Sequence, residues 1–296
     1  MNLLVTGAWK QALDYIERLK KQHKIIYMQW EKEKLPCEYE WVEGIIGNGI
    51  FLSHPIERFT NLKYIQLTST GYDRVPMEYV KEHNIEIYNA KNVYSIPMAE
   101  FAVAGVLQLY KQDRYFMNNQ KKHKWERHRG LLELYGKNVC IVGCGDVGDE
   151  CAKRFQAFGC HVIGVNRSEH ENKFYEKIYK LNNLKLVIKN ADIIIITIAL
   201  TTETRCLINR AALKNIKKTA IFVNIARGAV VDMEALKEKL PQIGGAVLDV
   251  FEEEPLSTES ELWNMENVIV TPHNSFVGDG TAKRLNEVIE KNLERR

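Results

Sequence analysis

The sequence has no hydrophobic run long enough to cross a membrane. Its longest apolar stretch, "ADIIIITIAL" at 191–200, is far shorter than the roughly 20 residues of a membrane-spanning helix. The first residues, "MNLLVTGAWK", have neither the basic start nor the apolar core of a signal peptide. We therefore expect a cytoplasmic protein with no membrane partner.

A strong excess of one charge is also missing. The 41 Lys and Arg nearly balance the 38 Asp and Glu, so nothing attracts the whole chain to nucleic acid. The basic stretch "KKHKWERHRG" at 121–130 is either a site for a phosphorylated ligand or the solvated end of a helix with its loop. The charge balance favours the second interpretation, and we expect no nucleic-acid partner.

Cysteine is scarce and does not form metal-binding patterns. None of the six cysteines belongs to a CxxC pair, and no His/Cys cluster has the spacing of metal ligands. Most of them lie in apolar segments, as small buried side chains do in a reducing compartment. We expect no metal site.

What the sequence does contain is an alternation of short apolar runs with helical segments. A chain of 296 residues suggests about two domains at roughly 150 residues each. The alternation predicts an α/β protein with two doubly wound parallel sheets. The strands of one sheet precede, and those of the other follow, a long apolar helix expected over 96–125. The expected strands lie at 2–7, 24–29, 44–49, 64–70 and 85–90, and then at 138–143, 161–166, 191–198, 220–225, 245–249 and 268–273.

A glycine-rich turn follows the first strand of the second series. Gly143, Gly145 and Gly148 form the G-x-G-x-x-G pattern between a strand and a helix, the context in which it binds a dinucleotide. They would permit, in order, the tight turn, the approach of the pyrophosphate and close helix–strand packing. The alternative is a tight turn without a ligand. With Asp146 and Val147, this turn is the expected phosphate site.

The next strand lacks the acidic residue that usually holds the adenosine ribose of NAD. It ends in Asn166, and Arg167 and Ser168 follow. Without the carboxylate, a 2′-phosphate is not repelled, and a guanidinium and a hydroxyl suit its oxygens. We therefore expect NADP to be preferred over NAD. The alternative is that Arg167 points to solvent and Asn166 only turns the chain.

Three polar residue types follow later strands. Arg227 comes after one buried strand, Glu252, Glu253 and Glu254 after the next, and His273 after another. Because the carboxyl ends of parallel strands meet at one edge, these side chains are expected to converge beside the coenzyme.

With these motifs in place, the chain resembles the D-isomer-specific 2-hydroxyacid dehydrogenases over nearly its whole length. The resemblance rests on "ELYGKNVCIVGCGDVG", "ALTTETRCLIN", "VNIARGAVVD", "LDVFEEEPL" and "VIVTPH" in this order. It implies a Rossmann-type coenzyme domain, 95–275, inserted in a flavodoxin-like substrate domain, 1–94 plus 276–296. It also implies a homodimer formed through the coenzyme domain and a small 2-oxo or 2-hydroxy acid as substrate.

The resemblance assigns roles to three catalytic residues. Arg227 would hold the carboxylate of a 2-oxo acid and polarise its ketone. His273 would donate the proton to the developing alkoxide, and accept it in the reverse direction. Glu254 would bond the other ring nitrogen of His273 and favour the protonated imidazole.

Further site residues follow from the same alignment of motifs. The coenzyme site would include Thr197, Ala199, Ile225, Ala226 and Asp249, although Thr197 and Ala199 replace the family's usual His and Pro. The expected substrate residues in the first domain are Asn48, Thr70, Gly71 and Tyr94. Phe276 stands where the family often has glycine and would narrow the substrate pocket.

Other functions within this fold stay open. A dinucleotide-binding regulator can keep all these residues, and a short NAD-dependent D-3-phosphoglycerate dehydrogenase has the same motifs. A formate dehydrogenase would carry Gln in place of the Glu paired with His, so Glu254 argues against it.

Overall fold

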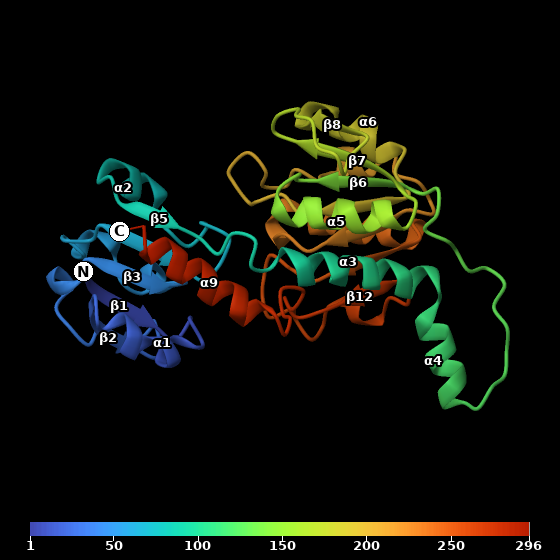
Figure 1. Cartoon of the computed structure of the whole chain (residues 1–296). Helices are drawn as coiled ribbons and strands as arrows, with labels where there is room; N and C mark the ends of the chain where they lie inside the picture. The colour runs from blue at the N-terminus through green and yellow to red at the C-terminus, as the bar shows by residue number, and fades with distance from the viewer. Residues whose placement is uncertain (296) are drawn as a thin grey trace. The chain divides into compact units, whose positions relative to one another are not determined.

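The computed structural model describes residues 1–295 and divides them into two compact units (Figure 1). Unit 1 contains Met1–Tyr94 and the chain from Gly278 onward, and unit 2 contains Ser95–Val277. The chain therefore leaves unit 1 once and returns to it with its last helix. Within the described residues, no helix is both long and apolar enough to span a bilayer.

Each unit is built on one parallel sheet. The strands of unit 1 are β1 Asn2–Thr6, β2 Lys24–Met28, β3 Gly44–Gly47, β4 Tyr64–Leu67 and β5 Glu86–Tyr88. Those of unit 2 are β6 Asn138–Val142, β7 His161–Asn166, β8 Lys177–Lys180, β9 Ile193–Ile196, β10 Ile221–Asn224, β11 Gly245–Leu248 and β12 Val268–Val270.

The α-helices connect these strands. They are α1 Ala12–Leu19, α2 Met77–Glu82, α3 Ser95–Tyr110, α4 Asp113–Lys121, α5 Asp146–Ala157, α6 Leu184–Lys189, α7 Arg210–Leu213, α8 Met233–Lys239 and α9 Thr281–Leu293. Short 3-10 helices are η1 Tyr39–Trp41, η2 Ile50–Leu52, η3 Ile56–Arg58, η4 Leu181–Asn183, η5 Gly228–Val230, η6 Leu240–Gln242 and η7 Glu261–Asn264.

The sheet of unit 1 has the strand order β2-β1-β3-β4-β5, which is the flavodoxin-like order. Alternate residues of β1 point to opposite faces: Leu3 packs with α1 and α9, and Leu4 packs with the residues around the 3-10 helices and α2. Because both faces are covered, the strands read as continuous apolar runs.

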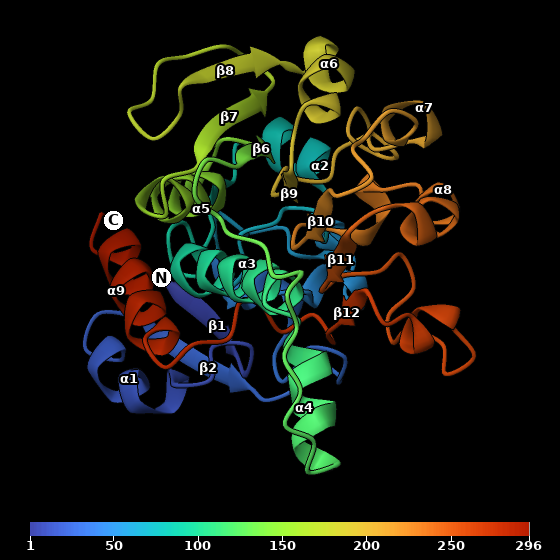
Figure 2. The same ribbon diagram turned by 90° about the vertical axis from the view of Figure 1, so that its right-hand side faces the viewer.

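The sheet of unit 2 has the order β12-β11-β10-β9-β6-β7-β8, which contains the Rossmann order. Figure 2 shows α3 and α5 on one side of this sheet and α6 to α8 on the other. The four isoleucines of β9 are buried and alternate between two cores: Ile193 and Ile195 pack with residues of α3 and α5, and Ile194 and Ile196 pack with residues of α6 to α8. Helix α3 packs closely because a Cβ on Gly105 would lie 2.8 Å from Val247. The predicted fold class is confirmed in both units.

The long helix expected over 96–125 is wrong as a single element. Helix α3 ends at Tyr110 and α4 starts at Asp113, and Gln112 between them has a φ of 57°. The backbone and the side-chain amide of Gln112 both donate to the Leu109 carbonyl and close the helix end. Such a side-chain cap leaves no mark in the hydrophobic pattern. Most of the basic stretch 121–130 is exposed after α4.

Candidate active site

The glycine turn follows β6 and opens α5. Gly143 has a φ of 105°, and a Cβ there would lie 2.5 Å from the Ile198 nitrogen. A Cβ on Gly148 would lie 2.1 Å from the Gly143 oxygen. At Gly145, by contrast, no heavy atom of the described chain beyond the neighbouring residues lies within 4 Å of a Cβ. Gly143 and Gly148 thus permit close backbone packing, and Gly145 leaves an open space at the start of α5, which we call the cradle.

This cradle fits the pyrophosphate of a dinucleotide. Gly145 caps α5, whose first N–H groups carry the positive end of the helix dipole, and no side chain caps it. Thr197 fixes the turn from the neighbouring strand, because its hydroxyl donates to the Gly143 oxygen at 2.7 Å. On the loop that follows, Ala199 is exposed and its carbonyl accepts from Thr204.

The ribose edge lies at the carboxyl end of β7. Asn166 is half-buried there, and Arg167 and Ser168 are exposed. Lys180 of β8 lies in register with Asn166, which adds a second cation to this edge. Sequence analysis missed Lys180 because β8 was not among the expected strands. Among the described residues, the last positions of β7 and β8 are Asn166 and Lys180, and neither is acidic.

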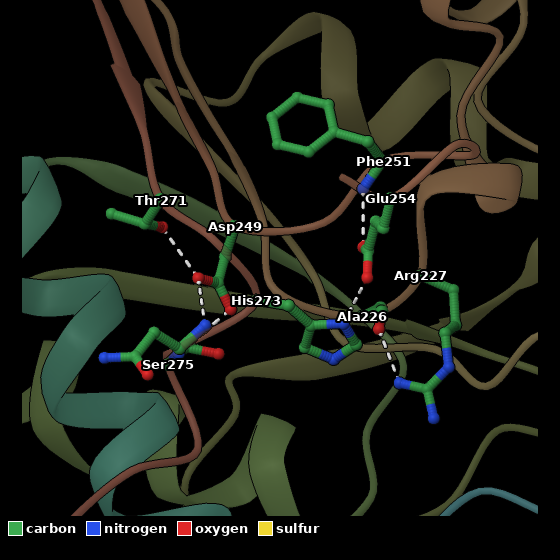
Figure 3. A network of polar contacts seen from close by, with 9 residues as sticks. Ala226, Arg227, Asp249, Phe251, Glu254, Thr271, His273 and Ser275 are labelled. Carbon is green, nitrogen blue, oxygen red and sulfur yellow. Dashed lines mark hydrogen bonds and ion pairs between the residues drawn. The ribbon is translucent and has the colours of Figure 1, made fainter. Parts of the chain in front are cut away.

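Glu254 and His273 are in contact. The Glu254 Oε2 lies 2.8 Å from His273 Nδ1, and its Oε1 accepts from the Phe251 N–H at 3.0 Å (Figure 3). The second bond holds the carboxylate in the orientation that meets the ring. The side chains are about one-third exposed, 38% and 32%, so the pair is open to a ligand. The Nε2 edge of the ring points away from Glu254 (Figure 3).

Asp249 holds the segment that carries His273. It is fully buried, and its carboxylate accepts hydrogen bonds from the Thr271 hydroxyl at 2.7 Å and from the N–H groups of Asn274 at 2.8 Å and Ser275 at 3.0 Å. These contacts fix the loop on both sides of the imidazole, and the coenzyme contact expected of Asp249 stays a prediction.

Arg227 follows β10 and is half-buried. Its guanidinium donates to the Ala226 carbonyl at 2.9 Å, and Ile225 and Ala226 are buried. Asn224 supports the turn, since its side chain accepts from the Ala226 N–H and donates to the Arg227 carbonyl. Sequence analysis missed Asn224, whose only signal is a polar residue at the end of a buried strand.

Gly228 brings the Arg227 turn against the loop of Glu254. A Cβ on Gly228 would lie 2.0 Å from the Phe251 carbonyl carbon, so any other residue would push the two loops apart. The structure thus brings Arg227, Glu254 and His273 to neighbouring loops of unit 2, which Figure 3 shows in one view.

The expected substrate residues lie at the carboxyl edge of the sheet in unit 1. Asn48 follows β3, and Thr70 and Gly71 follow β4, where the Thr70 carbonyl accepts from Asn89 at 2.8 Å. Tyr94 donates to the Thr68 carbonyl at 2.5 Å, and burial raises the pKa of its phenol to about 12. Tyr94 therefore stays neutral at physiological pH and serves as a hydrogen-bonding group.

Comparison with known proteins identifies relatives over the whole length. Residues 103–275 match the family model described as "D-isomer specific 2-hydroxyacid dehydrogenase, NAD binding domain". The chain is 34% identical over 290 residues to the glyoxylate reductase of Thermococcus gammatolerans, covering 92% of this chain and 86% of that protein.

Two solved structures extend the similarity. A D-isomer-specific 2-hydroxyacid dehydrogenase from Xanthobacter autotrophicus, solved with NADPH, has a TM-score of 0.79 and 26% identity and covers 98% of this chain and 93% of its own. The D-lactate dehydrogenase of Aquifex aeolicus, solved with NAD and lactic acid, has a TM-score of 0.85, covers 99% of this chain and 94% of its own, and at 24% identity shows the fold alone. The chain belongs to the D-isomer-specific 2-hydroxyacid dehydrogenase family.

Proposed function

We propose that this protein reduces a small 2-oxo acid to the D-2-hydroxy acid and prefers NADPH as the reductant. The observation that carries the proposal is the 2.8 Å contact between Glu254 and His273, on a loop next to Arg227. A carboxylate-oriented imidazole beside a guanidinium is the donor set that carbonyl reduction next to a carboxylate needs. In this proposal unit 2 binds the coenzyme and carries the three catalytic side chains, Arg227, Glu254 and His273.

Each catalytic side chain has one task. Arg227 binds the substrate carboxylate and polarises the ketone oxygen through charge-assisted hydrogen bonds. His273 donates the proton on Nε2 to that oxygen as negative charge develops on it. Glu254 accepts a hydrogen bond from the Nδ1–H of His273 and so orients the ring for the transfer. The nicotinamide coenzyme supplies the hydride when it is bound.

The preference for NADP rests on the charge of the ribose edge. Arg167, Ser168 and Lys180 offer two cations and a hydroxyl at the carboxyl ends of β7 and β8. The relative from Xanthobacter autotrophicus was solved with NADPH, which supports the same coenzyme here. The phosphate-binding turn, with Asp146 and Val147, serves either coenzyme.

Glyoxylate and hydroxypyruvate are the first substrates to test, because the archaeal relatives are glyoxylate reductases. Steady-state rates with NADPH and NADH across a panel of 2-oxo acids test both the reduction and the coenzyme preference. We expect turnover with a higher kcat/KM for NADPH. Absence of turnover with both coenzymes would reject the enzyme and favour a dinucleotide-binding regulator, and a preference for NADH would reject only the coenzyme assignment.

A homodimer formed through unit 2 and a cytoplasmic location complete the proposal. Helix α4 projects from unit 2 with the loop that follows it (Figure 1), and this arm exposes apolar side chains: Met117 by 57%, Trp125 by 99% and Tyr135 by 79%. A second copy would cover them. Light scattering on the wild type and on a Trp125→Ser, Met117→Ser variant tests this, and a monomeric wild type would reject the dimer.

A further inference from the structure

Tyr175 packs against the inner side of the glycine turn in unit 2. It is 8% exposed and comes just before β8. A Cβ on Gly148 would lie 3.1 Å from the Tyr175 hydroxyl oxygen, and a Cβ on Gly164 would lie 3.1 Å from its Cδ1. The phenol ring therefore fits against the first turn of α5 and against β7, because neither glycine has a side chain there.

The hydroxyl of Tyr175 lies near Cys144 and Asp149. Burial, and then the neighbouring Cys144 and Asp149, raise the pKa of the phenol, so the phenol keeps its proton and stays a donor. Cys144 is neutral as well, because burial raises the pKa of its thiol to about 12. Asp149 thus supplies the carboxylate of this cluster.

Two polar atoms of the cluster have only each other to interact with strongly. The Tyr175 hydroxyl and the Asp149 Oδ1 are both buried, and neither makes a well-aligned hydrogen bond to a residue within 1–295. A buried polar group without a partner costs free energy, and a carboxylate attracts a neighbouring phenol proton. The interaction between Tyr175 and Asp149 therefore keeps this carboxylate oxygen in the interior.

Asp149 belongs to the first turn of α5, and its N–H donates to the Gly145 carbonyl at 2.8 Å. The positive end of this helix and the cradle at Gly145 form the proposed pyrophosphate site. A carboxylate that turned outward from this turn would repel the coenzyme phosphates, and salt would weaken the repulsion. The inward direction of Asp149 avoids this cost.

We propose that Tyr175 is a positioning residue of the coenzyme site, which holds the Asp149 carboxylate inside the glycine turn and away from the pyrophosphate. The inference rests on the proposed binding of a nicotinamide coenzyme, and all its residues belong to unit 2. It applies to NADH and NADPH alike, because both carry the pyrophosphate.

The first test measures the Kd for NADH and NADPH by fluorescence titration. Tyr175→Phe keeps the ring and removes the donor, so both Kd values should rise about three- to tenfold, and less at high ionic strength. Asp149→Asn should bind at least as tightly as the wild type, and its addition to Tyr175→Phe should restore the affinity. Tyr179→Phe, at a half-buried position of β8, is the matched control and should leave both Kd values unchanged.

Two outcomes of this test would overturn the proposal. One is an unchanged Kd in a folded Tyr175→Phe protein. The other is a combined variant that binds as weakly as Tyr175→Phe, because a purely structural effect of the hydroxyl would not be rescued at Asp149.

The second test needs no coenzyme. If the two side chains interact, the fall in Tm of the combined variant should be smaller than the sum of the two single falls by about 2 °C or more. Additive falls would overturn the contact and the proposal with it. If the wild type binds neither coenzyme, the proposed function fails together with this inference, whereas a wild type that binds them and variants without the expected pattern would reject the inference alone.

Discussion

The backbone N–H of His273 donates a hydrogen bond to the carbonyl oxygen of Asp249, with an N···O distance of 2.8 Å. His273 has a φ of 52°, in the left-handed region that costs a non-glycine residue of the order of 1 kcal/mol. Such a backbone conformation persists only where its surroundings enforce it. Asp249 does so twice, through this carbonyl and through the carboxylate that binds the residues on either side of the imidazole.

Asp249→Asn should therefore reduce turnover through His273. The amide nitrogen would face one of the two N–H donors, and the loss of a charged acceptor in a buried place should cost roughly 1.5–3 kcal/mol of unfolding free energy. We expect kcat to fall while the Kd for coenzyme stays within about twofold, as measured by fluorescence titration. A large rise in that Kd with unchanged kcat would instead support the contact with coenzyme expected from the sequence.

His273→Ala should lose turnover and keep coenzyme binding. Removal of the general acid is expected to lower kcat by about a hundredfold to ten-thousandfold, because proton transfer is the only task assigned to this side chain. Single-turnover rates and coenzyme titration measure the two effects separately. His83→Ala, at an exposed position of unit 1, is the control and should match the wild type. Equal losses of turnover and of coenzyme affinity would contradict this division of tasks.

The sheets could be predicted because their strands are buried on both faces. A run such as Ile193–Ile196 has no other simple explanation, and glycines at Gly143 and Gly148 then indicate where the chain turns. Strand β8 escaped prediction because "KIYK" has charged ends and only one buried residue. Its place at the sheet edge comes from pairing with β7, which a local pattern does not show.

The candidate site, too, could be predicted from the sequence only in part. The order of Arg227, Glu254 and His273 after three strands indicated that they converge, since parallel strands end at one edge. The residues that hold them were not found. Gly228 acts through its close approach to the distant Phe251, and Asn224 acts through hydrogen bonds to the backbone of Ala226 and Arg227 that no hydrophobic pattern shows.

Arg167→Ala should separate the two coenzymes. We expect the Kd for NADPH to rise roughly ten- to a hundredfold, the value of one charge-assisted hydrogen bond, and the Kd for NADH to change little. Lys189→Ala, an exposed cation at the end of α6, serves as the control for a general loss of positive charge. An equal effect of Arg167→Ala on both coenzymes would show that Arg167 does not contact the 2′-phosphate.

Asp192 should make stability depend on pH at the acid end. Burial opposes ionisation of its carboxyl, but hydrogen bonds from Lys217 and from the Asn138 N–H outweigh it and lower the pKa below the ordinary 3.8. A lowered pKa stabilises the folded state above pH 3.8, and this contribution is lost as the pH falls through the lower value.

Asp192→Asn should thus cost about 1–2 kcal/mol at pH 7. Urea denaturation at a series of pH values should show the two proteins converging as the pH falls below 3.8. Glu171→Gln, at an exposed position, should follow the wild type throughout. A difference that stays constant with pH would assign the effect of Asp192→Asn to packing.

Two glycines of the phosphate-binding turn should respond in opposite ways to alanine. The Cβ of Gly145→Ala enters the open cradle at the start of α5, so the Tm should stay near the wild-type value while the Kd for either coenzyme rises about ten- to a hundredfold. The Cβ of Gly148→Ala would lie 2.1 Å from the Gly143 oxygen, so this variant should lose about 1–3 kcal/mol of stability. Thermal denaturation with coenzyme titration separates the two. Normal coenzyme binding by a folded Gly145→Ala protein would mean that the pyrophosphate does not occupy this cradle.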